Sequence, residues 1–185
     1  MNPSELKIWI AEIKKSNRLA FSNFFRESYG TYVAYAQRYV YSKDASADIV
    51  QEAFIKLWEV RDQLEAHKSL KAFMYTIVRN LALNYIRDHE SRYTELDEEN
   101  LSIHQEEKKD SGEDHSSESL FQVLISRLPE RQKEAFELSR FDGLQHDEIA
   151  QIMSVSPRTV NNHIVAALKT LRDEYEKETS KVMAL

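Results

Sequence analysis

The sequence contains no cysteine, three glycines and three prolines in 185 residues. The absence of cysteine excludes disulfide bonds and thiolate metal sites, and it fits a reducing compartment. Glycine and proline supply most tight turns, so their scarcity disfavours a sheet protein with many short strands. Long helices need few such residues. The composition therefore predicts an all-α protein.

The sequence also lacks a secretory signal and any apolar run long enough to span a membrane. We therefore expect no direct membrane insertion and a cytoplasmic location. With 42% hydrophobic residues, the chain can bury one sizeable core or two small ones.

The negative charge of the chain is concentrated in one stretch. The formal net charge is −6, but residues 91–118 alone carry −7, whereas residues 1–90 carry +2 and residues 119–185 carry −1. The acidic stretch is rich in serine, glutamate and aspartate and has almost no apolar periodicity. It predicts a flexible acidic linker over 93–118 that joins two helical domains, over 1–92 and 119–185.

The C-terminal domain carries two helical patterns joined by a short turn. In the first, over 147–153, apolar residues recur at helical spacing. The second starts at Pro157, with Ser156 as its expected N-cap. Helix, turn and helix together predict a helix-turn-helix motif. Ser154 stands where the turn often holds glycine, and a left-handed conformation there would cost under about 2 kcal/mol.

The helix that starts at Pro157 has two different faces. Its apolar residues form one predicted core stripe, Val160, Ile164, Leu168 and Leu171. Near the start of the helix, the other face carries short or hydrogen-bonding side chains: Arg158, Thr159, Asn161, Asn162 and His163. Such groups suit the reading of base edges in a DNA groove.

The N-terminal domain is expected to hold four helices, near 4–28, 30–41, 46–61 and 69–90. In the third, one broad side is apolar: Ile49, Val50, Ala53, Phe54, Leu57 and Trp58. The opposite side is mostly acidic, with an isoleucine in its middle: Asp48, Gln51, Glu52, Ile55 and Glu59. A solvated face with one stray isoleucine and a docking face for a basic helix both explain this pattern.

The fourth expected helix combines an apolar stripe with a mixed polar face. The stripe is predicted to comprise Leu70, Phe73, Met74, Ile77, Leu81 and Tyr85. The other side offers Lys71, Thr76, Arg79, Asn80, Leu83 and Arg87. This polar face could bind phosphates and an unstacked base, or it could be an ordinary hydrated helix surface.

Together these stretches resemble an extracytoplasmic-function (ECF) sigma factor of bacterial RNA polymerase. "DIVQEAFIKLWE" resembles the region 2 helix that docks on the polymerase, and "FMYTIVRNLALNYIRD" resembles the helix that captures the melted −10 element. "LPERQKEAF" followed by "HDEIAQIMSVSPRTV" resembles region 4, which binds the −35 element. The order and spacing of these motifs are more specific than any one of them.

The resemblance implies partners and a role for each set of residues. Core RNA polymerase would be contacted through its beta-prime clamp helices and beta flap, with the clamp helices meeting Asp48, Gln51, Glu52 and Ile55. The −10 element of promoter DNA would meet Lys71, Thr76, Arg79, Asn80 and Arg87. The −35 element would meet Arg158, Thr159, Asn161, Asn162, His163 and Lys169. An anti-sigma factor that masks the polymerase-binding surfaces is a further expected partner.

The chain departs from the family in the second helix of the helix-turn-helix. Relatives commonly have further lysine or arginine where this chain has Asn161, His163 and Ala166, so we expect fewer phosphate contacts and a shallower salt dependence. In related sigma factors, the linker between regions 2 and 4 threads polymerase channels that nucleic acid otherwise occupies. The acidic linker of this chain would occupy the same place. A polyanion mimic and a plain solubilising tether both explain its charge.

Two other classes of function are compatible with parts of the sequence. A stand-alone helix-turn-helix regulator explains the C-terminal domain equally well, but leaves the acidic face around Glu52 without a role. A metal phosphohydrolase would need many more ligands than the His146 and Asp147 pair, and the linker histidines His104 and His115 lack metal-ligand spacing. We therefore expect a regulatory subunit without catalytic residues, metal or cofactor.

Overall fold

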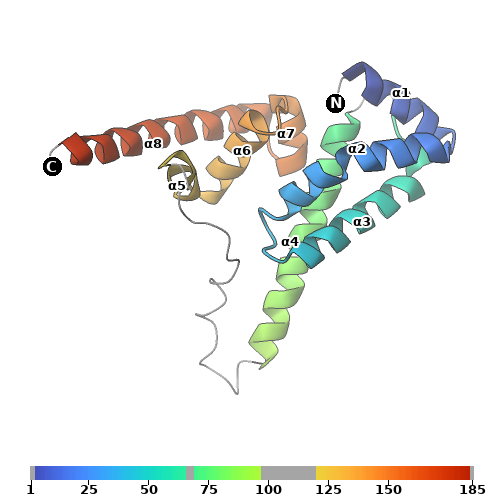
Figure 1. Cartoon of the computed structure of the whole chain (residues 1–185), viewed down its shortest axis with the longest axis horizontal. Coiled ribbons are helices and arrows are strands. Elements are labelled where there is room, and N and C mark those ends of the chain that lie inside the picture. Colours follow the sequence, from blue (N-terminus) through green and yellow to red (C-terminus); the bar gives the residue numbers. More distant parts are fainter. Residues whose placement is uncertain (1–2, 66–68, 97–119, 184–185) are drawn as a thin grey trace. The chain divides into compact units, whose positions relative to one another are not determined.

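The structure is a computed structural model that describes residues 3–65, 69–96 and 120–183. The chain divides into two compact units. The first contains helices α1 (Pro3–Lys14), α2 (Arg18–Ala36), α3 (Lys43–Glu59) and α4 (Leu70–Leu96), with a short 3₁₀ helix η1 (Arg61–Gln63). The second contains α5 (Leu120–Ser126), α6 (Glu130–Arg140), α7 (His146–Met153) and α8 (Pro157–Met183) (Figure 1). The described residues form helices and no strand, which confirms the all-α prediction.

The first unit is built around a cluster of aromatic rings. Tyr32 of α2 lies 6.0 Å from the ring centre of Phe54 of α3 and 5.3 Å from that of Tyr75 of α4. These edge-to-face contacts join three helices, and each ring buries a large apolar area. Burial raises the pKa of the Tyr32 hydroxyl, which has no hydrogen-bond partner in the described part of the chain.

The boundary between the first two helices differs from the sequence-based expectation. The expected break near residue 29 does not exist, because Gly30 lies inside α2. The chain instead turns at Ser16, which has a φ of 61°, and Asn17 caps α2 by accepting hydrogen bonds from the backbone of Leu19 and Ala20. Hydrogen bonds from Asn17 and Lys15 also hold the pKa of Glu12 below its usual range.

Helix α3 has the two faces that the sequence predicts. Ser42 caps its start, since its hydroxyl accepts a hydrogen bond of 3.2 Å from the Ala45 backbone. Five of the six predicted apolar residues are buried: Ile49, Val50, Ala53, Phe54 and Leu57. The sixth, Trp58, is half-buried. The predicted core face of this helix is confirmed.

In α4 the predicted faces are only partly correct. The side packed into the core carries Ala72, Met74, Tyr75, Val78, Arg79 and Ala82. Of the predicted stripe, Leu70 and Met74 are buried, whereas Phe73, Ile77, Leu81 and Tyr85 are only half-buried. The physical reason is the aromatic cluster: Tyr75 lies 4.5 Å from the ring centre of Tyr35, which turns this side of the helix inward.

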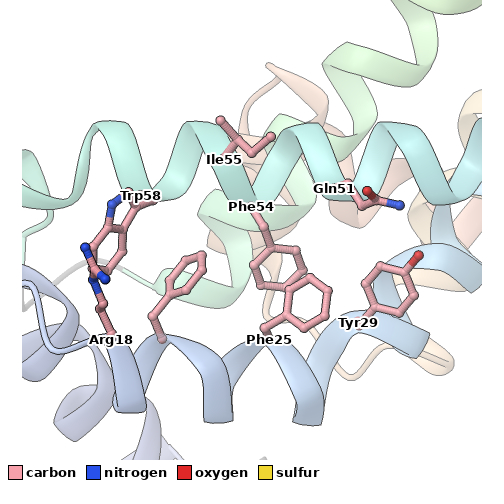
Figure 2. Close-up of a pocket in the computed structure, with 8 residues that line it drawn as sticks. Arg18, Phe25, Tyr29, Gln51, Phe54, Ile55 and Trp58 are labelled. Atoms are coloured by element: carbon pink, nitrogen blue, oxygen red, sulfur yellow. The ribbon is translucent and has the colours of Figure 1, made fainter.

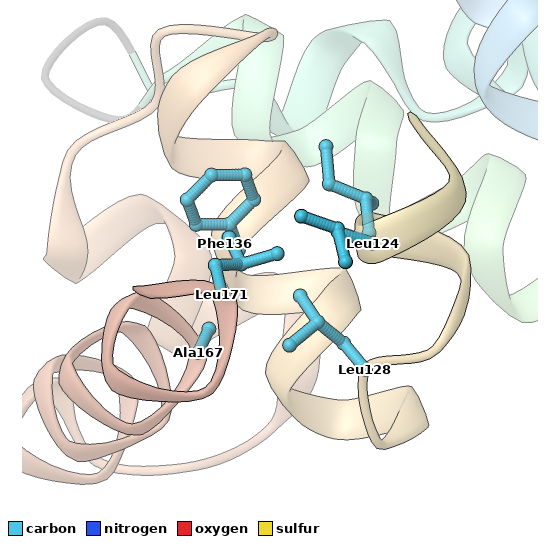
Figure 3. Close-up of a cluster of buried hydrophobic side chains, with 6 residues drawn as sticks. Leu124, Leu128, Phe136, Ala167 and Leu171 are labelled. Atoms are coloured by element: carbon cyan, nitrogen blue, oxygen red, sulfur yellow. The ribbon is translucent and has the colours of Figure 1, made fainter. Parts of the chain in front are cut away.

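The second unit packs α5 and α6 against α8. Figure 3 shows this small core, in which Phe136 of α6 and Leu124 and Leu128 face Ala167 and Leu171 of α8. An ion pair of 3.1 Å between Arg127 and Glu178 joins the end of α5 to the later part of α8. Such an exposed pair adds little stability, so the apolar contacts hold the unit together.

The turn between α7 and α8 follows the prediction closely. Ser154 is left-handed, with φ 55° and ψ 47°, and the Ser156 hydroxyl accepts a 3.0 Å hydrogen bond from the Thr159 backbone. The core stripe of α8 contains one error. Leu168 is 41% exposed, and Ala167 takes the buried position instead.

Helix α4 continues to Leu96, and the predicted linker over 93–118 lies almost entirely outside the described residues. The domain limits 1–92 and 119–185 therefore stay predictions. No helix in the described ranges is long and apolar enough to cross a membrane.

Candidate functional surfaces

The outer face of α3 presents charge and one large apolar side chain to solvent. Asp48, Gln51 and Glu52 are exposed, and Ile55 is 58% exposed among them. The Glu52 carboxylate pairs with Lys56 one turn further on, at 2.9 Å. This pair is exposed at both partners and is therefore weak. A cationic partner would have to compete only with that weak pair for Glu52.

An apolar groove of about 590 Å³ lies between α2 and α3, beside this face. Figure 2 shows Phe25 and Tyr29 pointing from α2 toward α3, with the Phe54 ring of α3 against Phe25 and Ile55 on the outer side of α3. The complete lining is Arg18, Phe21, Phe25, Tyr29, Gln51, Phe54, Ile55 and Trp58. Two residues of the predicted polymerase contact, Gln51 and Ile55, thus also line an aromatic groove. Sequence reasoning missed this groove.

One end of the groove is braced by Arg61. Its guanidinium lies 4.6 Å from the centre of the Trp58 ring and donates a hydrogen bond of 2.6 Å to the Trp58 carbonyl. It also donates to the Ser16 hydroxyl at 2.8 Å. Arg61 therefore ties the turn before α2 to the end of α3, the two helices that form the groove.

The exposed face of α4 contains only part of the predicted −10 set. Asn80 and Arg87 are exposed. Thr76 and Lys71 are half-buried, and the Thr76 hydroxyl donates a hydrogen bond of 2.8 Å to the Ala72 carbonyl. Arg79 is the clear exception, because it is 8% exposed and lies on the core side of the helix.

Asn80 has neighbours on the outer face of α4 that sequence reasoning missed or misassigned. Asn84 is exposed one turn further along the helix, and Phe73, Ile77 and Leu81 lie half-buried on the same side. The face therefore combines amide groups with partly exposed apolar side chains. Such a surface can both hydrogen-bond and stack on an unpaired base.

The polar face of α8 is largely exposed. Arg158, Asn161, Asn162 and Lys169 are exposed, whereas Thr159 and His163 are half-buried. The Thr159 hydroxyl lies 2.8 Å from that of Ser156, so it takes part in the cap. The start of α8 thus offers a guanidinium and two amides to solvent, near a helix N-terminus that favours anions.

The second unit also exposes an aromatic patch that sequence reasoning missed. Phe121 is 48% exposed and Phe141 57% exposed, and both rings lie against the buried Phe136, at 6.4 and 6.1 Å between ring centres. Leu120, which precedes Phe121 in α5, is 41% exposed. Two exposed phenylalanines around one buried ring are typical of a protein contact surface.

The described residues contain no group of three or more histidine, aspartate or glutamate side chains that could hold a metal ion. The surfaces on α3, α4 and α8 are made of charged, amide and apolar groups.

Comparison with known families assigns both units of the chain. A family described as Sigma-70 region 2 matches residues 24–92, which include all of α3 and most of α4, with Asn80 and Arg87. A second, described as Sigma-70, region 4, matches residues 119–171, which include the helix-turn-helix. The chain belongs to the sigma-70 family. Both regions occur in the order that the sequence motifs predicted, and together they cover most of the chain outside the linker.

Curated relatives place this sigma factor in the ECF group. The chain is 28% identical over 180 residues to the ECF RNA polymerase sigma-E factor of Escherichia coli (strain K12), covering 92% of this chain and 94% of that protein. It is also 28% identical over 140 residues to RNA polymerase sigma factor SigV of Bacillus subtilis (strain 168), covering 76% and 81%. A stand-alone helix-turn-helix regulator is not favoured, because it leaves the region 2 match unexplained.

Solved structures share the fold. CnrH, solved in complex with the cytosolic domain of CnrY, matches with a TM-score of 0.65 and 16% identity, over 94% of this chain and 98% of that one. The sigma factor RpoE of Bartonella quintana, solved with the anti-sigma factor NepR, matches with a TM-score of 0.65 and 22% identity, over 84% and 96%. The region 2 and region 4 matches, together with the ECF relatives, give this chain the role of an RNA polymerase sigma factor, a regulatory subunit for transcription initiation.

Proposed function

We propose that the outer face of α3, together with the groove beside it, is the contact of this sigma factor with core polymerase. Asp48 and Glu52 supply negative charge for a basic partner such as the beta-prime clamp helices, and Ile55 supplies an exposed apolar anchor. The groove extends the apolar part of this surface toward Trp58. Charge would then set the orientation of docking, and burial of Ile55 would contribute to affinity.

The outer face of α4 is the proposed binding site for the melted −10 element. Asn80 and Arg87 carry this role among the predicted residues, because both are exposed. Lys71 and Thr76 are half-buried and contribute at the edge of the face. Arg79 is left out of the proposal, since its buried side chain supports the fold of α4. An amide on a partly apolar helix face suits an unpaired base.

The polar face of α8 is the proposed reader of the −35 element. Arg158, Asn161 and Asn162 contact base edges in the major groove, and Lys169 contacts the phosphate backbone. Thr159 and His163 lie at the border of this face and are half-buried. Their contribution is therefore smaller than the sequence pattern indicated.

The aromatic patch of Leu120, Phe121 and Phe141 is the proposed contact for the beta flap, since no other exposed aromatic pair occurs in the described part of the second unit. We further propose a cytoplasmic location, and an anti-sigma factor that masks the polymerase-binding surfaces. The RpoE and NepR complex of Bartonella quintana supports the latter idea.

The observation that carries this proposal is the exposure of Ile55 inside an acidic helix face beside an aromatic groove, because a merely hydrated helix face needs neither. The test mixes the full-length chain with purified core polymerase and measures the complex by sedimentation. A polymerase subunit forms a stable complex without DNA. A chain that sediments alone at micromolar concentrations contradicts the proposal.

A further inference from the structure

Val165 stands in the middle of the polar face of α8 and is 57% exposed. Asn161 and Asn162 precede it by about one helical turn, and Lys169 follows it by about one turn, so these four side chains share one side of the helix. Val165 is thus an apolar side chain flanked by hydrogen-bonding and charged groups that are proposed to contact DNA.

Neither core packing nor helix stability explains a valine at this position. The core side of α8 is filled by Val160, Ile164, Ala167 and Leu171, all of which are buried. Valine is also β-branched and forms helices less readily than alanine, lysine or glutamine. A surface position free of other demands would favour one of those residues. The valine therefore points to a contact that α8 makes outside the described chain.

The DNA major groove offers one base group that matches such a side chain. Thymine carries a methyl group at C5, which is the apolar feature of that groove, while the other base groups there are hydrogen-bond donors and acceptors. We propose that Val165 reads the C5-methyl group of a thymine in the −35 element, next to the bases contacted by Asn161 and Asn162. This inference rests on the proposed role of α8.

The experiment removes the thymine methyl group alone. The wild-type chain with core polymerase first selects a −35 sequence from a library randomised at that element. Each thymine of the selected sequence is then replaced, one at a time, by deoxyuridine, which lacks only the C5-methyl group. Replacement at one or two positions is expected to weaken promoter binding by the polymerase with this chain roughly fourfold. This is the change in affinity that corresponds to the loss of one buried methyl-sized group.

A variant links this loss to Val165. V165A should bind the all-thymine promoter about as weakly as the wild type binds the deoxyuridine promoter, and it should no longer distinguish thymine from deoxyuridine. Alanine favours the helix, so the variant folds, which circular dichroism checks. Y175A is the matched control: Tyr175 is 53% exposed later on α8, and this variant should keep the wild-type response to deoxyuridine.

Three outcomes would overturn the inference: a selected −35 element without a preferred thymine, a wild type insensitive to every replacement, or full sensitivity retained in V165A. Asn161→Ala and Asn162→Ala separate this failure from that of the proposed function. Suppose that one of these asparagine variants changes the selected −35 sequence, while the wild type shows no loss with deoxyuridine or V165A shows the same loss as the wild type. In that case only the role of Val165 is wrong. If neither asparagine variant changes the selected sequence, α8 is not the −35 reader.

Discussion

The guanidinium group of Arg61 stacks on the Trp58 ring, 4.6 Å from its centre. The same group donates a hydrogen bond to the hydroxyl of Ser16, which lies in the turn between α1 and α2. Arg61 begins η1, one residue after the Val60 C-cap of α3. Its side chain therefore connects the turn at Ser16 to Trp58, which lines the groove. The geometry of the proposed polymerase contact therefore depends on a residue outside the predicted contact set.

Arg61→Ala should destabilise the first unit by about 1 kcal/mol, since it removes a half-buried cation–π contact and two hydrogen bonds. Urea unfolding monitored by tryptophan fluorescence measures this change. Arg26→Ala is the matched control, because Arg26 is exposed on α2 and does not line the groove. Equal stability of the two variants would show that the brace contributes nothing.

Glu52→Lys should weaken core polymerase binding by a few kcal/mol at most, because it places a positive charge in the acidic face opposite a basic partner. Ile55→Ser should also weaken binding, through loss of the apolar anchor. Core affinity and circular dichroism are measured together. Glu27→Lys, on α2 and outside the groove lining, should bind like the wild type. Unchanged affinity for both α3 variants rules out this docking face.

Asn80→Ala should impair promoter opening more than formation of the closed complex, because an unstacked base becomes available only after the strands separate. Permanganate footprinting detects unpaired thymines directly. Glu27→Ala, exposed on α2 and outside the proposed −10 set, serves as the control. Normal opening by Asn80→Ala would refute the −10 role of this face.

Ser154→Gly should stabilise the second unit by up to about 1 kcal/mol, because glycine adopts the observed φ of 55° without the steric cost that serine bears. Ser154→Val should be destabilising for the opposite reason. Thermal unfolding of both variants gives the comparison. A lower melting temperature for the glycine variant than for the wild type would mean that the serine hydroxyl matters more than the backbone strain.

The sequence predicted most reliably those features that depend on local patterning. The two faces of α3 and the Ser156 cap are each specified within a few consecutive residues, and all were confirmed. The turn at Ser16 and Asn17 was missed, because the first helix was expected to run through it, near 4–28. Gly30 is in fact tolerated inside α2, where a Cβ would meet nothing within 4 Å.

Features that depend on packing between distant segments were not predictable from the pattern. Nearly every side of α4 carries apolar residues, so periodicity alone could not choose its inner face. The choice is made by Tyr75, which packs on Tyr32 and Tyr35 of α2. That packing buries Arg79 and exposes Asn84. The groove was not predictable for the same reason, because its lining residues come from two different helices, α2 and α3.

We propose that this chain directs core polymerase to promoters through region 2 and region 4 acting together. Transcription by core polymerase from a randomised promoter library, with and without the full-length chain, tests it most directly. Transcripts should require the chain and should start downstream of two preferred elements separated by a constant spacer. Asn161→Ala or Asn162→Ala should change only the upstream element. Transcripts that do not depend on the chain, or a single preferred element, would contradict it.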